Sequence, residues 1–493
     1  MKKRSKLILS AIALTGILGS VTGCQKDTFK GLTIHFWHTF GQTVLGGLET
    51  CARDYAKIIK ETEGVDLRIK FTYKGGYSDV LGEVGKSFGA GGNPTITVAY
   101  PDHVADYFAS EGDRPGRYVV DLQPYAESTE YGFGTEEALG DKYGIEDFVS
   151  GFIAESKNYY KKGMYSIPFL KSTEVMLYNE DLVRKAIKVI DGRDLTTSEE
   201  IREELESYSW EEFMDFCELV KEKKNEISPA LEYPCIYDSD GNLFITQLYQ
   251  RGIPFASLGS APNSGIIDFD GRNENATESQ KQAYKDVQDL LKKYQDWHKK
   301  GLFTTKGVTG QYSSYYFEPQ HAMFAIGSCG GSGYSFPKNN EFTVGCIKVP
   351  YSNNNPVYVS QGPTLTVLHN SKLQQSGKDD EAVLYAWKFI KYITNEEINA
   401  KQCTLNSEGY IPVRESAYST STFTRYLSSS TAYVVVTKMV VNDIAGSYFS
   451  TPVFKGSASL REQCEGILAD VLKAKESIKT ILDRGLEQAS GLM

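Results

Sequence analysis

The sequence has few cysteines, and their spacing fits neither a metal site nor a disulfide framework. Apart from Cys24, they are scattered over the chain without a CxxC motif and without a histidine at metal-ligand spacing. They are Cys51, Cys217, Cys235, Cys329, Cys346, Cys403 and Cys464. Seven is an odd number, so at least one is unpaired, and a chain of 493 residues can bury a core that needs no disulfides. We therefore expect free, buried thiols and no metal site.

Long hydrophobic runs are also missing. The first apolar run, residues 7–19, is shorter than the roughly 20 apolar residues that cross a membrane. Lys2, Lys3, Arg4 and Lys6 precede it, so the pattern is typical of a cleavable secretory signal over residues 1–23, with an uncleaved helical anchor as the alternative. The later run AYVVVTKMVV at 432–441 is shorter still and carries Lys438.

Excess positive charge and catalytic motifs are absent as well. The net charge of −10 argues against a nucleic acid or an anionic membrane surface as partner. There is no G-x-S-x-G and no HExxH, and the glycine-rich GSCGGSG at 327–333 lacks the Lys-Ser/Thr ending of a P-loop. A surface-anchored hydrolase with paired carboxylates stays open, because the 63 acidic residues do not exclude such a pair.

What the sequence does contain is an alternation of strands and helices. LTIHFW at 32–37, DLRIKFTYK at 66–74 and TITVAY at 95–100 are β-branched and aromatic, which predicts three buried strands. Helical spacing over 45–63, with Gly64 as a stop, and a weaker helical pattern over 77–89 separate them. This order favours a parallel α/β sheet covered on both faces. Ligands of such sheets bind beyond the carboxyl ends of the strands. That rule places His38, Thr39, Tyr73, Lys74 and Asp102 around one rim.

The rest of the chain continues as mixed α/β. Residues 209–224 and 277–300 carry apolar stripes at helical spacing, and the second begins with TESQ, a capping-box pattern. The segment 321–334 predicts a strand that ends in a glycine-rich turn, 357–368 a strand, and 382–394 a helix.

Several stretches together resemble a known family. SVTGC, ending at Cys24, resembles the lipobox of bacterial lipoproteins. Six further stretches follow in the family's order, and with the lipobox the chain resembles the ABC-transporter extracellular solute-binding lipoproteins, in the sugar-binding branch with the maltose- and glycerol-3-phosphate-binding proteins. The stretches are LTIHFWHTFG, NPTITVAYPDHVADY, YSIPFLKSTEVMLYNEDLVRKA, SWEEF, AMFAIGSCGGSGY and AWKFIKYITNEEINAKQCTLNSEGYIPVRESA.

The resemblance implies an α/β protein with a two-lobed, periplasmic-binding-protein-like fold of type II. Each lobe is then a sheet flanked by helices, and the ligand cleft lies between the lobes. After the signal peptide and a tether at 24–31, lobe 1 would comprise 32–170 and 346–395, and lobe 2 would comprise 171–345 and 396–493. The first crossover is expected near SIPFLKST at 166–173.

The resemblance also implies a function. It predicts a monomeric receptor, not an enzyme, that binds a carbohydrate or sugar derivative without a cofactor and delivers it to ABC permease subunits. Lipid on Cys24 would hold it on the extracellular face of the cytoplasmic membrane, in the periplasm if an outer membrane exists.

Candidate ligand contacts in the first lobe lie at the ends of its strands. Trp37 could stack on a sugar ring or pack in the core, and alternation turns it away from His38, which could bond a hydroxyl or be structural. Thr39 and Tyr73 lie at the same rim. Asp102 could accept two hydroxyl hydrogen bonds, cap the following helix, or do both.

The other candidates lie near the crossover and in the second lobe. Ser172, Thr173 and Glu174 follow the expected crossover and could bond a ligand or serve the turn. The backbone of Gly330, Gly331 and Ser332 lets a ligand approach closely. Tyr410 and Arg414 match the family's last cleft motif. Arg414 would bind a phosphate or carboxylate if the ligand carries one, and would otherwise be a structural cation that pairs the two lobes.

Overall fold

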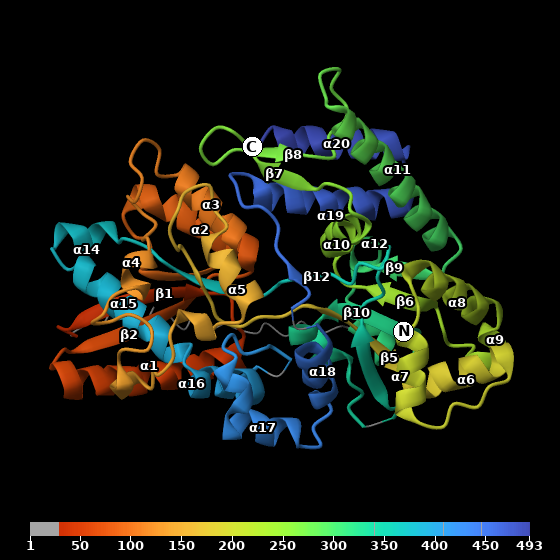
Figure 1. Cartoon of the computed structure of the whole chain (residues 1–493), viewed down its shortest axis with the longest axis horizontal. Coiled ribbons are helices and arrows are strands. Elements are labelled where there is room, and N and C mark those ends of the chain that lie inside the picture. Colours follow the sequence, from red (N-terminus) through yellow and green to blue (C-terminus); the bar gives the residue numbers. More distant parts are fainter. Residues whose placement is uncertain (1–28, 340, 408, 445) are drawn as a thin grey trace, which may run out of the picture.

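The chain folds into two lobes, each built on a five-stranded sheet with helices on its faces (Figure 1). A computed structural model describes residues 29–493 except 340, 408 and 445. The predictions for the signal peptide, for Cys24 and for most of the tether therefore lie outside the described residues.

The first sheet has the strand order β2-β1-β3-β13-β4. Its strands are β1 Leu32–His38, β2 Leu67–Tyr73, β3 Ile96–Ala99, β4 Ile167–Pro168 and β13 Thr364–Val367. The three strands predicted from the N-terminal alternation are confirmed, and β1 pairs in parallel with both β2 and β3. β13 runs antiparallel to β3 and β4, so a late segment of the chain completes the first lobe.

Helices cover both faces of this sheet. Helix α1, Gln42–Glu63, ends at Gly64 as predicted, because the glycine takes the left-handed conformation with φ +75°. It packs on α15, Asp379–Ile393, where the Tyr55 hydroxyl donates to the Tyr385 carbonyl at 2.8 Å. Helices α2 and α3 lie on the opposite face (Figure 1). The other helices of this part are α2 Tyr77–Ala90, α3 Pro101–Ala109, α4 Gln123–Ala126, α5 Ser150–Ala154, α14 Ser371–Gln375 and α16 Glu396–Lys401.

The second sheet has the order β11-β5-β10-β6-β9. Its strands are β5 Glu174–Asn179, β6 Tyr233–Tyr237, β9 Phe303–Thr305, β10 Ala322–Ser328 and β11 Val344–Lys348. The remaining strands are β7 Ala256–Leu258, β8 Gly265–Ile267, β12 Tyr358–Val359 and β14 Tyr448–Phe449. The predicted strand and glycine-rich turn at 321–334 are confirmed as β10 followed by a 3₁₀ segment, whereas the strand expected at 357–368 is divided between β12 and β13.

Capping residues set the starts of the long helices around the second sheet. Ser209 and Thr277 each form a capping box, and the helices predicted at 209–224 and 277–300 are confirmed as α8 and α11. The helices in this part are α6 Glu180–Asp191, α7 Ser198–Glu206, α8 Trp210–Glu222, α9 Lys224–Ile227, α10 Asp240–Arg251, α11 Glu278–Lys299, α12 Lys306–Thr309, α13 Ser314–Phe317, α18 Val434–Met439, α19 Ser457–Lys473 and α20 Ile478–Ser490. Helix α17, Ser421–Leu427, packs instead on α16 of the first lobe. Short 3₁₀ or π segments are η1 Glu137–Leu139, η2 Ile145–Asp147, η3 Glu155–Lys157, η4 Cys329–Ser335, η5 Gln402–Asn406, η6 Ser416–Ser419 and η7 Val440–Ile444.

Three stretches of chain connect the lobes side by side. Ser172 and Gln361 exchange backbone hydrogen bonds of 3.0 and 2.9 Å, and β12 pairs in parallel with β14. The first stretch follows β4, the second joins β12 to β13, and the third contains β14. Three connections restrict the relative movement of the lobes to a hinge about this strip.

The return of the chain to the first lobe is placed differently from the expectation. Position 346 lies within β11, which pairs with β5 in the second sheet, so the rejoining strand is β13. The start of lobe 2 at 396 is also too early, because the Asn399 side chain donates to the Phe169 carbonyl at 2.9 Å. Both errors have the same cause: a buried strand or helix has the same apolar pattern in either lobe.

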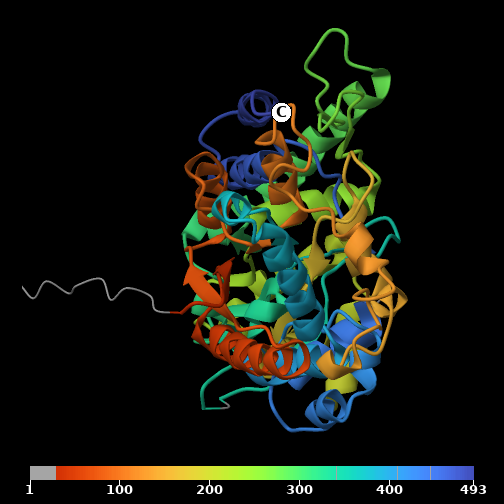
Figure 2. The same ribbon diagram turned by 90° about the vertical axis from the view of Figure 1, so that its left-hand side faces the viewer.

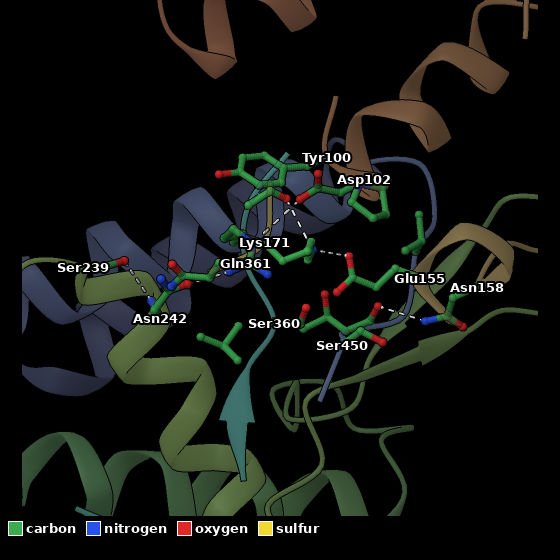
Figure 3. A pocket seen from close by; sticks show the side chains of 16 residues that line it. Tyr100, Asp102, Glu155, Asn158, Lys171, Ser239, Asn242, Ser360, Gln361 and Ser450 are labelled. Atoms are coloured by element: carbon green, nitrogen blue, oxygen red, sulfur yellow. Dashed lines mark hydrogen bonds and ion pairs between the residues drawn. The ribbon is translucent and has the colours of Figure 1, made fainter. Parts of the chain in front are cut away.

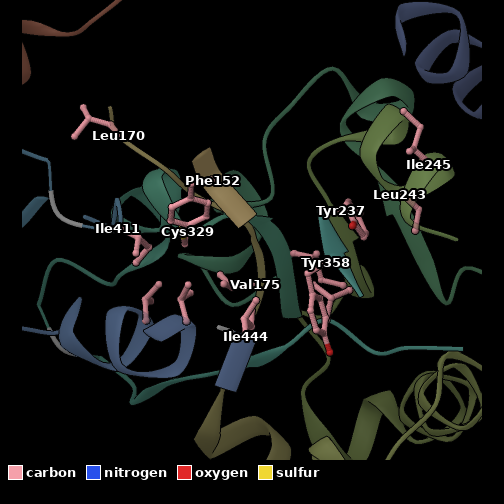
Figure 4. Close-up of a cluster of buried hydrophobic side chains, with 14 of the residues drawn as sticks. Phe152, Leu170, Val175, Tyr237, Leu243, Ile245, Cys329, Tyr358, Ile411 and Ile444 are labelled. Carbon is pink, nitrogen blue, oxygen red and sulfur yellow. The ribbon is translucent and has the colours of Figure 1, made fainter. Parts of the chain in front are cut away.

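One hydrophobic cluster runs from the first lobe through the connecting stretches into the second. Figure 4 shows Phe152 and Leu170 at one side of it and Tyr237 and Leu243 at the other. Cys329 lies in this cluster, and the seven cysteines that the structure describes are all free and buried, as predicted. Over the described residues, no helix combines the length and apolar character of a membrane span, and no cluster of His, Cys, Asp and Glu could hold a metal ion.

Candidate functional site

A cavity of about 230 Å³ lies where the connecting stretches meet both lobes (Figure 3). The first lobe contributes side chains from the end of β3 and from the segment after α5, and the second contributes α10 and α19. Its polar lining residues are Tyr100, Asp102, Glu155, Asn158, Lys171, Ser239, Asn242, Ser360, Gln361, Ser450, Thr451 and Arg461. A ligand held here touches both lobes and all three connections.

A buried ion pair forms one wall of the cavity. The Lys171 ammonium lies 2.8 Å from Glu155 Oε2, and the exposed fractions of the two side chains are 1% and 4%. Lys171 also donates to the Gly362 carbonyl at 3.4 Å, which ties the first connecting stretch to the second. Charges buried this deeply need partners, so the pair fixes both side chains in place.

A chain of polar contacts crosses from one lobe to the other. Asp102 Oδ2 in the first lobe lies 3.8 Å from Arg461 Nε in the second, and Arg461 Nη1 donates to Asn242 Oδ1 at 2.8 Å. Asn242 in turn donates to Glu174 Oε1 at 3.3 Å, and the Tyr237 hydroxyl donates to the other oxygen. Burial raises the pKa of Glu174 to about 8, so this carboxyl is mostly protonated at pH 7.

The lobes also touch directly beside the cavity. The Asn263 amide donates to the Ala105 carbonyl at 2.9 Å, and the Gly456 N–H donates to Asp106 Oδ1 at 3.0 Å. Burial raises the pKa of Asp106 to about 6. These contacts join α3 to the second lobe, so the structure has the lobes together on this side.

A group of tyrosines adjoins the cavity. The rings of Tyr77 and Tyr100 lie 4.4 Å apart, and the Thr39 side chain lies beside Tyr77. Tyr410 packs on Gly330, where a Cβ atom would stand 2.7 Å from the ring, so only glycine leaves room there. Such rings can cover the apolar face of a sugar while their hydroxyls bond its rim.

Of the predicted contacts, the structure places Asp102 in the cavity lining. It is not the helix cap, because α3 begins at Pro101 with Tyr100 as N-cap, but its Oδ1 accepts from the His103 N–H at 2.9 Å in the first turn. Glu174 adjoins the cavity through Asn242. Ser172 and Thr173 lie in the first connecting stretch, where the Thr173 hydroxyl donates to the Val359 carbonyl at 2.9 Å, so it serves the connection.

Other predicted residues have structural partners. The Lys74 ammonium lies 3.7 Å above the ring of Trp37, and His38 is buried with its Nδ1 accepting from the Phe40 N–H at 3.2 Å. The Ser332 hydroxyl donates to the Cys329 carbonyl at 2.7 Å. Tyr73 is 62% exposed, and Gly331 borders a small void beside β10.

Arg414 does not reach the cavity, which corrects its assignment as an anion-binding residue. Its guanidinium is buried in the first lobe and donates to the carbonyls of Thr394 (2.9 Å), Tyr143 (3.1 Å) and Gly144 (2.9 Å). The alternative, a structural cation that pairs the two lobes, is right about a structural cation and wrong about the pairing between lobes. Its contacts lie within the first lobe, because the chain has not yet left that lobe at residue 414.

Several lining residues were missed at the level of sequence. Lys171 stands inside the stretch expected to cross between the lobes, and its position next to Ser172 and Thr173 was the available signal. Glu155, Asn242 and Arg461 lie on short or amphipathic helical segments, where a polar residue has the pattern of an ordinary solvated face.

Comparison with known proteins agrees with this arrangement. Residues 54–428 match the family described as bacterial extracellular solute-binding protein. The sn-glycerol-3-phosphate-binding periplasmic protein UgpB of Escherichia coli strain K12 is 23% identical over 466 residues, which cover 94% of this chain and 92% of the relative. The protein of the same name from Shigella flexneri serotype 5b is also 23% identical, with the same coverage.

Solved structures share the fold. The GacH receptor of Streptomyces glaucescens has a TM-score of 0.60 at 17% identity and covers 94% of this chain and 98% of its own. The cyclic alpha-maltosyl-1,6-maltose binding protein from Arthrobacter globiformis has a TM-score of 0.62 at 15% identity, with coverage of 94% and 99%. UgpB from Mycobacterium tuberculosis in complex with glycerophosphocholine has a TM-score of 0.59 at 16% identity, with coverage of 92% and 99%. The predicted two-lobed α/β fold is confirmed.

Proposed function

Because the chain belongs to the family of bacterial extracellular solute-binding proteins, we propose that it captures a sugar or sugar derivative between its lobes and delivers it to an ABC permease. The observation that carries the proposal is the cavity between the lobes, where Asp102 and Arg461 face each other from opposite sides. The family is one of binding proteins rather than enzymes, so it replaces the hydrolase alternative. Binding and lobe closure are the whole of the activity, and covalent chemistry has no part in it.

The chemistry of the lining supports a polyhydroxylated ligand. Carboxylates, amides and hydroxyls converge from both lobes, with the Tyr100 ring beside them. The two relatives named for sn-glycerol-3-phosphate, the structure with glycerophosphocholine and the maltose-type binding proteins all point to hydroxyl-bearing solutes. A micromolar complex needs about −8 kcal/mol, which a few hydroxyl bonds and one covered sugar face supply after the cost of closure.

The first test is a ligand screen on protein that starts at residue 25. Thermal stability is measured with maltose, mannobiose, tagatose, sn-glycerol-3-phosphate and glycerophosphocholine, and each ligand is recovered and analysed afterwards. We expect at least one to raise the melting temperature and to be recovered unchanged. Turnover of any of them at enzyme-like rates, or no stabilisation by any of them, would contradict the proposal.

Asp102→Asn is expected to weaken the binding of the ligand found in this screen by about 10- to 100-fold. The reason is that a hydrogen bond to a charged group contributes about 1.5–3 kcal/mol, and the amide replaces one accepting oxygen by a donor. Isothermal titration measures the change. Asp113→Asn is the matched control, because Asp113 is exposed and does not line the cavity. Equal affinity in the two variants would show that Asp102 does not contact the ligand.

We also propose that the protein is a monomer anchored by lipid on Cys24, outside the described residues. The support is the SVTGC sequence behind a basic and apolar leader. Cys24→Ala is expected to move the protein from the detergent phase to the aqueous phase in a phase-partition assay and to leave solute affinity unchanged. A variant that still enters the detergent phase would contradict the anchor, and loss of affinity would contradict its separation from the binding site.

A further inference from the structure

Two buried oxygen atoms in the cavity wall lack a hydrogen-bond partner. They are Glu155 Oε1 and Ser360 Oγ, and of the polar atoms without partners in the described part of the chain they are the ones that belong to cavity-lining residues. Only 3% of Glu155 is exposed. Leaving such groups unpaired costs roughly 1–3 kcal/mol each, and more for a charged group, so their position in a ligand cavity indicates that a ligand supplies the partner.

The neighbouring cations are already occupied. Lys171 pairs with Glu155 Oε2 and donates to the Gly362 carbonyl. Arg461 donates to Asn242 and lies near Asp102. The open hydrogen-bonding capacity at the Glu155 end is therefore one carboxylate oxygen, which accepts, and one serine hydroxyl, which donates or accepts. Figure 3 shows Glu155 between Lys171 on one side and Ser360 and Ser450 on the other.

We propose that Glu155 and Ser360 together bind one free hydroxyl of the ligand. The proposal rests on the proposed function and defines the chemistry of one end of the solute. A ligand hydroxyl donates a hydrogen bond to Glu155 Oε1 and accepts one from the Ser360 hydroxyl, which gives both atoms a partner. A phosphate or carboxylate does not fit at this end, because its oxygens only accept and its charge is repelled by Glu155. An anionic group, where the ligand has one, lies elsewhere in the cavity.

Lys171 is the positioning residue of this pair. Because it holds Oε2, free rotation of the carboxylate is blocked, and Oε1 is the oxygen left without a partner. It does so from the first connecting stretch, while Ser360 lies in the second, so the hydroxyl site joins two of the three connections. Binding of that hydroxyl is thereby coupled to the hinge.

The test is a double-mutant cycle with Glu155→Gln and Ser360→Ala. Glutamine keeps an oxygen for Lys171 and turns an amide donor toward the ligand, so a hydroxyl loses its charged acceptor. We expect at least 30-fold weaker binding in Glu155→Gln and about 3- to 10-fold weaker binding in Ser360→Ala. The loss of affinity in the double variant should be smaller than the product of the two single losses, because both side chains bind the same hydroxyl. The probes are maltose, mannobiose and glycerophosphocholine, measured by isothermal titration.

Two controls keep the outcomes distinct. Ser260→Ala changes an exposed serine that does not line the cavity, and it should change affinity less than 3-fold. Melting curves without ligand verify that each variant is folded. If the wild-type protein binds none of the probes, the proposed function is wrong. If it binds a probe and the Glu155 and Ser360 variants bind that probe as tightly as the wild-type protein, the proposed hydroxyl site is wrong. The site is also wrong if the loss of affinity in the double variant equals the product of the two single losses. Tighter binding of inorganic phosphate by Glu155→Gln than by Ser260→Ala would assign this end to an anion and overturn the proposal.

Discussion

Arg414→Met is expected to lower the free energy of unfolding by about 3–5 kcal/mol and to leave solute affinity unchanged. The guanidinium lies against the rings of Phe133 and Phe148, with its central carbon 4.9 and 4.2 Å from their centroids. Asp141 and Asp147 each have a carboxylate oxygen 3.6 Å from one of its nitrogens. Methionine fills the space of the side-chain stem but leaves Asp141, itself fully buried, with one cation fewer.

The loss is large because the surroundings offer no replacement. Burial lowers the pKa of Arg414 while the acidic groups around it favour its charged form, so the arginine and the carboxylates stabilise one another. Lys391 remains at 3.1 Å from Asp141, but it also holds Glu136. Water cannot enter, because 1% of the arginine side chain is exposed.

Urea unfolding followed by circular dichroism measures this prediction, and titration with the ligand found in the screen measures affinity. Arg425→Met is the control, because Arg425 is exposed on α17 and its loss should change stability by no more than about 0.5 kcal/mol. If Arg414→Met were as stable as this control and failed to bind ligand, Arg414 would be a ligand contact as the family resemblance implied.

Local patterns were enough to predict most elements of the fold. The strand β1 was predicted from its β-branched and aromatic residues, and in the structure buried and partly buried residues alternate along its length. Gly64 ends α1 and Thr277 begins α11, because the left-handed conformation and the capping box are set by a few neighbouring side chains. Features determined within about one helical turn were therefore accessible from the sequence.

The assignment of elements to lobes was not accessible in the same way. VGCIK in β11 has the apolar composition of any buried strand, and nothing within it states that its partner is β5, far away in the sequence. Similarly, GYIPVR lies close to the tyrosines of the cavity at Tyr410, yet Arg414 points into the first lobe. Four residues along an irregular segment were enough to separate the two environments.

The cavity was still harder to predict from the sequence than the assignment of elements to lobes, because it depends on contacts between distant segments. Glu155 precedes Lys171 by only 16 positions, but the group that includes Ser360 and Arg461 forms only after the chain has passed between the lobes three times. Asp102 was predicted because it follows a strand of a parallel sheet, a place with a general rule. Arg461 lies within a long helix, where no such rule applies.

Glu174→Gln is expected to remove most of a decline in stability between pH 5 and pH 8. Burial raises the pKa of this carboxyl to about 8 in the folded protein, against an ordinary value of 4.5. Below pH 4.5 it is protonated in the folded and the unfolded chain, so it makes no difference to stability. Between pH 4.5 and 8 only the folded chain holds the proton, so the free energy of unfolding falls as pH rises, by up to about 1.4 kcal/mol per pH unit.

Glutamine has no proton to lose, so this contribution disappears in the variant. It can still hydrogen-bond Tyr237 and Asn242, the two partners of Glu174, so the packing around β5 is preserved. We expect the variant to gain on the order of 4 kcal/mol relative to the wild-type protein as pH rises from 5 to 8. Urea unfolding at several pH values gives the difference between the two proteins, in which the contributions of Asp106 and other shared groups cancel.

The exposed Glu274→Gln serves as the control and should follow the wild-type protein at every pH. Parallel curves for Glu174→Gln and wild type would mean that Glu174 is ionised in the folded state at pH 7, with its negative charge balanced through Asn242 by Arg461. In that case Glu174 is charged at pH 5 and at pH 8, and the cost of Arg461→Gln in stability is nearly the same at the two pH values. A Glu174 whose pKa is about 8 predicts instead a larger cost of Arg461→Gln at pH 8 than at pH 5, because the nearby arginine favours the charged carboxylate, which forms only as the pH approaches 8. The same pair of variants thus determines whether the residue behind Asn242 acts as a neutral hydrogen-bonding group or as a buried anion.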